Sequence, residues 1–185
     1  MELAPLDCGL AIGQTFPLET MEGLTASKVM AEAAVHKGKK GIRVTEPPGA
    51  TANADPPLLL PVKDFESGTI EAEVSGARGF VGIAFRVGDD TAKYDAFYPR
   101  PTNGRADDQV RRNHSAQYIS HPGWPWPRLR KEEPEKYESY VDLAPGARPT
   151  LVVNDLKQGA WTGQVGLWIG PGTIAHFRNI KVTKK

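Results

Sequence analysis

Short runs in which apolar and polar residues alternate, separated by glycine and proline, constrain the fold of this chain more than any other feature. Residues 69–74 (Thr-Ile-Glu-Ala-Glu-Val) and 80–87 (Phe-Val-Gly-Ile-Ala-Phe-Arg-Val) place apolar side chains at every second position. A period of two is typical of β-strands with one buried face. No segment keeps a helical period over three turns, so the sequence predicts an all-β fold. Further strands are expected at 94–100, 112–118, 150–154, 164–169 and 175–183.

Turn residues divide these strands. The chain contains 19 glycines and 16 prolines, a content that suits many short strands better than a helical bundle. Residues 28–44 predict a hairpin, because two apolar runs flank the basic turn Lys37-Gly-Lys-Lys-Gly. Residues 46–57 contain adjacent prolines that cannot donate to a strand ladder, so they predict a surface loop.

The predicted domain is a single β-sandwich over residues 16–185, preceded by a lead-in at 1–15; the 185 residues suit one domain. Within the last strand, Phe177 and Ile180 fall out of phase. This predicts a β-bulge at residues 178–179, since an extra residue restores both side chains to one face.

Charge and composition exclude several classes of partner. Lys and Arg number 23 against 22 Asp and Glu, a formal net charge of +1, which argues against nucleic-acid and membrane-surface binding. No stretch has the apolar length of a membrane span. Cys8 is the single cysteine, so no disulfide forms within the chain. The first residues lack the basic region of a signal peptide, which at face value places the chain in the cytoplasm.

The stretch 94–142 differs from the rest. Its only Val, Ile or Leu residues are Val110, Ile119, Leu129 and Val141, yet it holds all five tyrosines and two of the four tryptophans. A stretch so poor in aliphatic residues is not expected to pack mainly into a core, and its aromatic content argues against disorder. We interpret it as a polar functional surface, the alternative being a solvent-exposed face that has polar and aromatic side chains but no function.

Alternation within this stretch suggests how its side chains are displayed. Tyr94, Ala96, Tyr98 and Arg100 are expected on one strand face, and residues 112, 114, 116 and 118 on one face of the next strand. Planar polar groups pair with sugar hydroxyls, and aromatic rings cover apolar sugar faces. The candidate ligand-binding residues are Tyr94, Tyr98, Arg100, Asn103, Arg105, Asp108, Gln109, Arg112, His114, Tyr118, Trp124 and Trp126. The alternative is that the charges pair with one another, with Arg100, Arg105 and Arg112 bridging to Asp107 and Asp108.

Two further features bear on chemistry. Trp124 and Trp126 lie in a proline-rich loop, either as a stacking platform or as a small satellite core. His114, Asp108 and Glu138 are candidates for an acid/base role. Glu71 and Glu73 have glycosidase-like spacing but are more typical of a solvated strand face. No cofactor or metal site is expected, the alternative being Ca²⁺ binding at the Asp-Asp pairs 89–90 and 107–108.

Several segments resemble concanavalin A-like, laminin-G-like jelly-roll domains, close to the bacterial 3-keto-disaccharide hydrolase-like group and an uncharacterised subgroup of it. They are residues 80–86, 93–98, 163–173 and 177–182, with 100–115 and 136–142 as the more specific stretches. The resemblance implies a jelly-roll β-sandwich, association with carbohydrate, and a periplasmic or secreted location. It supplies no established catalytic pair.

One departure from that family affects the expected fold. The relatives follow a Val-Asp-Leu-x-Pro-Gly segment with a hairpin, whereas residues 143–155 pass straight to the next strand. Losing a hairpin should leave an exposed sheet edge or uncovered apolar area, so self-association is expected.

The sequence therefore favours a carbohydrate-binding β-sandwich domain. The first alternative is a glycoside-active enzyme, either a hydrolase or an eliminase. The second is a laminin-G-type module that binds protein.

Overall fold

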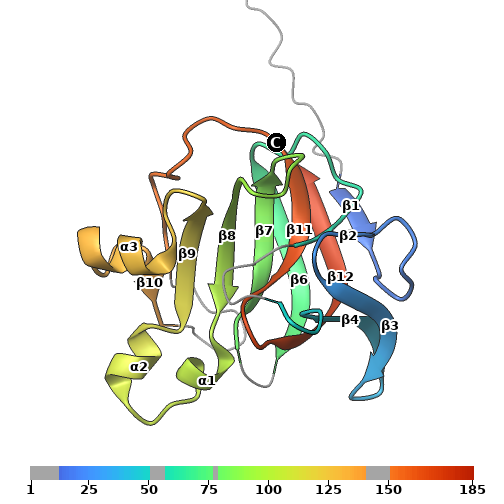
Figure 1. Cartoon of the computed structure of the whole chain (residues 1–185), viewed down its shortest axis with the longest axis horizontal. Coiled ribbons are helices and arrows are strands. Elements are labelled where there is room, and N and C mark those ends of the chain that lie inside the picture. The colour runs from blue at the N-terminus through green and yellow to red at the C-terminus, as the bar shows by residue number, and fades with distance from the viewer. Residues whose placement is uncertain (1–12, 51–56, 77–78, 141–150) are drawn as a thin grey trace, which may run out of the picture.

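Two antiparallel β-sheets form the body of the protein. The computed structural model describes residues 13–50, 57–76, 79–140 and 151–185. Figure 1 shows β9, β8, β7 and β11 running side by side, with the second sheet beside and behind them. The five-stranded sheet contains β1 (Gly13–Phe16), β12 (Ile174–Lys184), β4 (Lys39–Thr45), β3 (Met30–His36) and β6 (Gly68–Gly76). The seven-stranded sheet runs β10 (Glu138–Ser139), β9 (Ala116–His121), β8 (Tyr94–Pro99), β7 (Val81–Val87), β11 (Gln164–Ile169), β5 (Leu58–Leu59) and β2 (Thr25–Ala26).

The predicted hairpin and the alternating strands are confirmed. β3 and β4 pair throughout, joined by Lys37 and Gly38 at φ 51° and 74°, the left-handed geometry that a tight two-residue hairpin requires. β6 and β7 cover the two clearest alternating runs of the sequence. The first strand begins at Gly13, so the last residues of the expected lead-in belong to the five-stranded sheet.

The predicted bulge in the last strand is also confirmed. The register of β12 against β6 shifts between Arg178 and Lys181, and Asn179 lies at φ 48°. The shift leaves both Phe177 and Ile180 fully buried. β12 pairs with β4 before the bulge and with β1 after it, so the bulge lets one strand serve two neighbours.

Apolar side chains between the two sheets form the core. Ile42 and Val44 from β4, and Phe177, Ile180 and Val182 from β12, supply one side. The opposite sheet contributes Val81, Val165, Leu167 and Ile169. Each is at most 1% exposed, as is typical of apolar residues at every second position of a strand with one buried face.

Most described residues between 94 and 140 are exposed or partly exposed, as expected, but most tyrosines of this stretch enter the core. Tyr94, Tyr98, Tyr118 and Tyr137 are at most 3% exposed, and only Tyr140 is open to solvent. Tyrosine rings fill the space that aliphatic side chains occupy elsewhere, and their hydroxyls find polar partners on burial. Low aliphatic content therefore did not reveal that these tyrosines are buried.

The predicted strand at 112–118 is confirmed only for residues 116–118, which belong to β9. Two short helices, α1 (Pro101–Gly104) and α2 (Gln109–Asn113), precede β9, and a third, α3 (Trp126–Glu132), follows it. Asp108 caps α2 by accepting a hydrogen bond from the Arg111 amide, and capping by Asp favours the helical turn. None of the described helices is long and apolar enough to cross a bilayer.

The predicted strand at 150–154 is also wrong for residues 151–154, which form no strand; residue 150 lies outside the described residues. The segment beyond them lies instead on the inner face of β8 and β9. There the Lys157 amide donates to Tyr118 Oη at 2.9 Å, and Arg86 Nη1 donates to the Gly159 carbonyl at 2.6 Å. The relatives' hairpin is expected to be missing from residues 143–155, of which 143–150 lie outside the described residues.

Candidate ligand-binding face

One row of side chains crosses the outer face of the seven-stranded sheet, which is the face turned away from the other sheet. Strand register places Trp168 opposite Gly82, and Gln117 opposite both Tyr98 and Glu138. Directly opposed residues project from the same face of a sheet. The row therefore joins residues from five strands in the order β11, β7, β8, β9 and β10.

The absence of a side chain at Gly82 allows the aromatic part of this row to form. A Cβ at Gly82 would lie 2.2 Å from the Phe97 carbonyl oxygen and 2.5 Å from Tyr98 Cβ. Without one, the Tyr98 ring stacks on Trp168 across β7, with centroids 4.6 Å apart. Trp168 Nε1 also donates to Tyr94 Oη at 3.3 Å. These rings are buried, so they support the site rather than present open stacking faces.

Arg100 lies directly beyond Tyr98 and is only 9% exposed. Its Nη2 donates to Tyr98 Oη at 3.3 Å and to Gln117 Oε1 at 3.1 Å. The guanidinium also lies 5.4 Å from the Phe80 ring and 5.6 Å from the Trp126 ring. Arg100 is thus held by neutral groups, and its Nε is buried with no hydrogen-bond partner in the described part of the chain.

Gln117 fixes the orientation of this arginine. Its Nε2 donates to the carbonyl oxygens of Tyr118 and Tyr137, both at 3.1 Å. With both amide donor bonds committed to backbone, the amide oxygen faces the guanidinium of Arg100.

Glu138 ends the row beside His114 and Arg130. Arg130 donates to both carboxylate oxygens, with Nε 2.9 Å from Oε1, and His114 Nδ1 lies 2.9 Å from Oε2. Burial raises the pKa of Glu138, but hydrogen bonds and charge from Arg130 and His114 outweigh it and the net pKa is lowered. An ionised carboxylate whose two oxygens already accept hydrogen bonds is unsuited to act as a general acid. It is suited to orient an imidazole.

A hollow of about 420 Å³ opens next to this group. Its lining residues are Val110, Asn113, His114, Glu135, Glu138, Ser139 and Tyr140. The volume falls within the roughly 300–1,000 Å³ typical of small-molecule sites.

Four of the predicted sugar-binding residues instead hold the connection between β8 and β9. Arg112 donates to the carbonyls of Ala106 and Asp107, both at 2.7 Å, and to Gln109 Oε1 at 2.6 Å. Asn103 Nδ2 donates to the His114 carbonyl at 3.1 Å, and Asp108 is the cap of α2. The predicted bridges from Arg100, Arg105 and Arg112 to Asp107 and Asp108 do not form among the described residues, because Arg112 binds backbone oxygens and Asp108 caps a helix.

The structure also separates the remaining tyrosines from the site. Tyr118 points to the inner face, where it donates to Asp95, and burial raises its pKa. Tyr94 shares the outer face but stacks on His121 at its other end, with centroids 5.1 Å apart. Of the predicted set, the structure brings together Tyr98, Arg100, His114 and Trp126.

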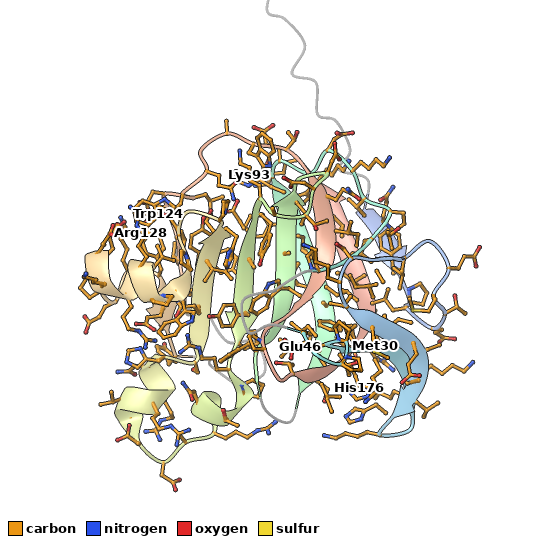
Figure 2. The ribbon with its side chains drawn as sticks, viewed as in Figure 1. Met30, Glu46, Lys93, Trp124, Arg128 and His176 are labelled. Atoms are coloured by element: carbon orange, nitrogen blue, oxygen red, sulfur yellow. The ribbon has the colours of Figure 1, made fainter. Side chains whose placement is uncertain are left out.

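The two tryptophans of the proline-rich loop have different surroundings. The Arg128 guanidinium lies 3.8 Å from the centre of the Trp124 ring, and the Lys157 ammonium lies 4.4 Å from it. Figure 2 shows Arg128 beside Trp124. Trp126 is 42% exposed and lies between Arg100 and Arg130. Trp126 is therefore the more accessible ring.

Other candidate groups lie elsewhere. Glu71 and Glu73 face solvent on the five-stranded sheet, opposite Lys181 and Arg178 respectively. Asp90 Oδ1 accepts a hydrogen bond from the Ala92 amide within a turn. No cluster of His, Cys, Asp and Glu among the described residues could hold a metal ion.

Sequence reasoning missed Gln117, Arg130, Trp168 and Phe80 as parts of this face. The prediction took the face of residues 112, 114, 116 and 118 as the binding face. The pairing of β9 with β8 instead places Gln117 opposite Tyr98, and it places Tyr118 on the inner face. Trp168 stood in a correctly predicted strand, and its alternation with Leu167 was the available signal that it faces outward.

Comparison with protein-family models, curated proteins and solved structures finds no match to this chain. The family resemblance of the sequence therefore stays a prediction, and the two-sheet architecture rests on the structure alone.

Proposed function

We propose that this chain is a carbohydrate-binding domain of jelly-roll type, with its ligand site on the outer face around Arg100, Gln117, Trp126 and the hollow beside Glu138. The observation that carries the proposal is the pairing of a half-exposed indole with a fixed guanidinium within one site. Aromatic rings cover the apolar faces of sugars, and planar donors bind their hydroxyls.

Several features of the face suit a sugar. Arg100 and Gln117 are held by hydrogen bonds before any ligand arrives, so little conformational entropy is lost on binding. Trp126 is a large ring with few rotatable bonds, which keeps that cost low as well. The rigid aromatic layer beneath, formed by Tyr98 and Trp168, supports both.

A glycoside-active enzyme is the second candidate, and the His114–Glu138 contact favours it. Glu138 is 4% exposed at its side chain and His114 is 31% exposed. A buried carboxylate that orients a partly open imidazole is a common arrangement for a general base. In that reading His114 acts on the substrate in the adjacent hollow, and Glu138 is a positioning residue.

A glycan array followed by product analysis tests the proposal. We expect the wild-type protein to retain at least one glycan class, and Trp126→Ala to weaken its binding by roughly 10-fold, since one ring contact contributes on the order of 1 kcal/mol. Met30→Ala is the matched control, because Met30 is 51% exposed on the edge strand β3 of the other sheet (Figure 2).

The same samples separate binder from enzyme. Retention without any change in the glycan supports the binding domain. Cleavage that is lost in His114→Gln, with binding retained, supports the enzyme. Equal affinity of Trp126→Ala and the wild type would contradict this location of the site.

A further inference from the structure

We propose that Arg100 receives a carboxylate, so that the ligand of this face is an acidic sugar of the uronic-acid class. This inference rests on the proposed carbohydrate function and specifies the chemical class of the ligand.

Arg100 is a buried cation without an anionic partner in the described residues. The side chain is nine-tenths buried, yet its hydrogen bonds go to the neutral Tyr98 hydroxyl and Gln117 amide. Burying a charge is costly unless the charge is paired, and buried arginines are normally paired. The site therefore lacks one negative charge, and a ligand can supply it.

The donor inventory of Arg100 indicates where the missing group binds. Nη2 is engaged with Tyr98 and Gln117, whereas Nε is buried and unpartnered. Unsatisfied buried donors in a folded protein call for an explanation, and a bound ion or ligand is one of the few available. A carboxylate oxygen is a strong acceptor for such a donor.

The surroundings favour a ligand with one negative charge on an apolar ring. Trp126 lies 5.6 Å from the guanidinium and is 42% exposed, which offers a stacking surface beside the cation. Glu138 already neutralises the charge of Arg130. On β10, Glu138 lies opposite Gln117 of β9, and Gln117 in turn accepts a hydrogen bond from Arg100. A dianion such as a phosphate monoester would meet the Glu138 charge, whereas a uronate brings a single charge and a sugar ring together.

A paired glycan array tests this inference. Each uronate-containing oligosaccharide is printed beside the same oligosaccharide after carboxyl reduction, and sulfated glycans are printed beside their desulfated forms. We expect the wild-type protein to prefer the carboxylated member of a pair by about 10-fold or more, as for loss of a charge-assisted hydrogen bond.

Substitutions at Arg100 connect the preference to this residue. Arg100→Gln should abolish the preference, and Arg100→Lys should keep part of it, since the charge remains while the guanidinium geometry is lost. Arg128→Gln is the matched control: it also removes an arginine stacked on a tryptophan, but one that is exposed and paired with Glu132 at 3.0 Å. Melting temperatures confirm that each variant is folded.

A second measurement does not depend on the array. The Arg100 Nε–H resonance in a ¹⁵N spectrum should shift when free glucuronate is added and should stay in place with glucose. Equal retention of both members of each pair, with a silent Nε–H, would overturn the acidic ligand and leave sugar binding intact. A shift with glucuronate but no glycan retained would keep the carboxylate site and overturn the carbohydrate function. Preference for sulfated members alone would overturn the assignment to a carboxylate.

Discussion

Arg86 and Arg100 are both buried arginines of the seven-stranded sheet region, but their partners differ. Arg86 donates to Asp95 from Nε at 2.9 Å and also reaches the Gly159 carbonyl. Asp95 is fully buried and further accepts from Tyr118, so this charge is matched inside the protein. Arg100 has no such carboxylate among the described residues. Burial alone therefore does not distinguish a structural arginine from a binding one, whereas the identity of its partners does.

Stability should fall when the pH is lowered from 7 to 5, in part because of His176. Burial lowers its pKa below 6.5, and the charges of His36 and Arg43 lower it further; its ring stacks on His36 with centroids 4.0 Å apart. Below about 6.5 the unfolded chain takes up a proton that the folded state does not, so stability rises with pH in this window. Charged groups that line the adjoining hollow are Lys37, Lys39, Lys40, Glu73 and Arg178.

Melting temperatures at pH 5, 6, 7 and 8 measure this dependence. His176→Asn should reduce its slope without removing it, since burial also lowers the pKa of His121. An unchanged slope in His176→Asn would contradict the assignment.

The connection from β8 to β9, which contains the short helices α1 and α2, behaves as one structural element. Arg112 joins the carbonyls that precede α2 to the side chain of Gln109 within it. Asn103 ties α1 to the residue that follows α2. This element ends at Ser115, whose carbonyl accepts a hydrogen bond from the Arg100 amide at 2.7 Å. The bond joins the two ends of the connection next to the site.

Arg112→Ala should therefore lower stability while leaving ligand affinity unchanged. Loss of hydrogen bonds from a partly exposed guanidinium costs about 1–2 kcal/mol, which corresponds to a fall of roughly 3–6 °C in melting temperature for a chain of this size. Arg111→Ala is the control, because Arg111 is an exposed neighbour with no side-chain hydrogen bond among the described residues. A stable Arg112→Ala with weakened glycan binding would contradict the structural role.

The sequence predicted most of the long strands and the bulge because alternation and phase are local properties. The faces of Tyr94, Tyr98 and Arg100 followed in the same way from β8 alone. Gln117 could not be placed on the binding face from the sequence, since that assignment depends on the register between β8 and β9. The contact between Arg130 and Glu138 depends on how α3 packs beside β10, and no local pattern in the sequence carries that information. Tyrosine burial was missed because composition does not reveal which polar groups meet their hydroxyls.

At the scale of the whole molecule, the described residues leave an apolar opening between the two sheets. An apolar cleft of about 550 Å³ lies between β6 of one sheet and β7 and β8 of the other. Val74 is 39% exposed and Phe97 is 36% exposed at this opening. β6 pairs only with β12 among the described strands, so it forms an edge beside the cleft.

The edge itself disfavours the self-association that the sequence suggests. Antiparallel pairing of two β6 strands about Ala72 would place Glu71 of one copy opposite Glu73 of the other. Like charges directly opposite are destabilising in a sheet, and charged residues on edge strands are a common protection against edge pairing. The apolar cleft, rather than the edge, should therefore be the accessible feature in solution.

We accordingly expect the protein to bind a hydrophobic dye while remaining monomeric. Ala72→Leu should reduce dye fluorescence, because the larger side chain fills a cleft that Ala72 lines. Met30→Leu is the control, since it changes an exposed apolar residue on β3, outside the cleft. Dye fluorescence and light scattering on the same samples distinguish the outcomes. A dye-silent wild type would mean that the cleft is closed in solution, and a dimer that dissociates in Glu71→Lys would mean that the edge pairs despite its charges.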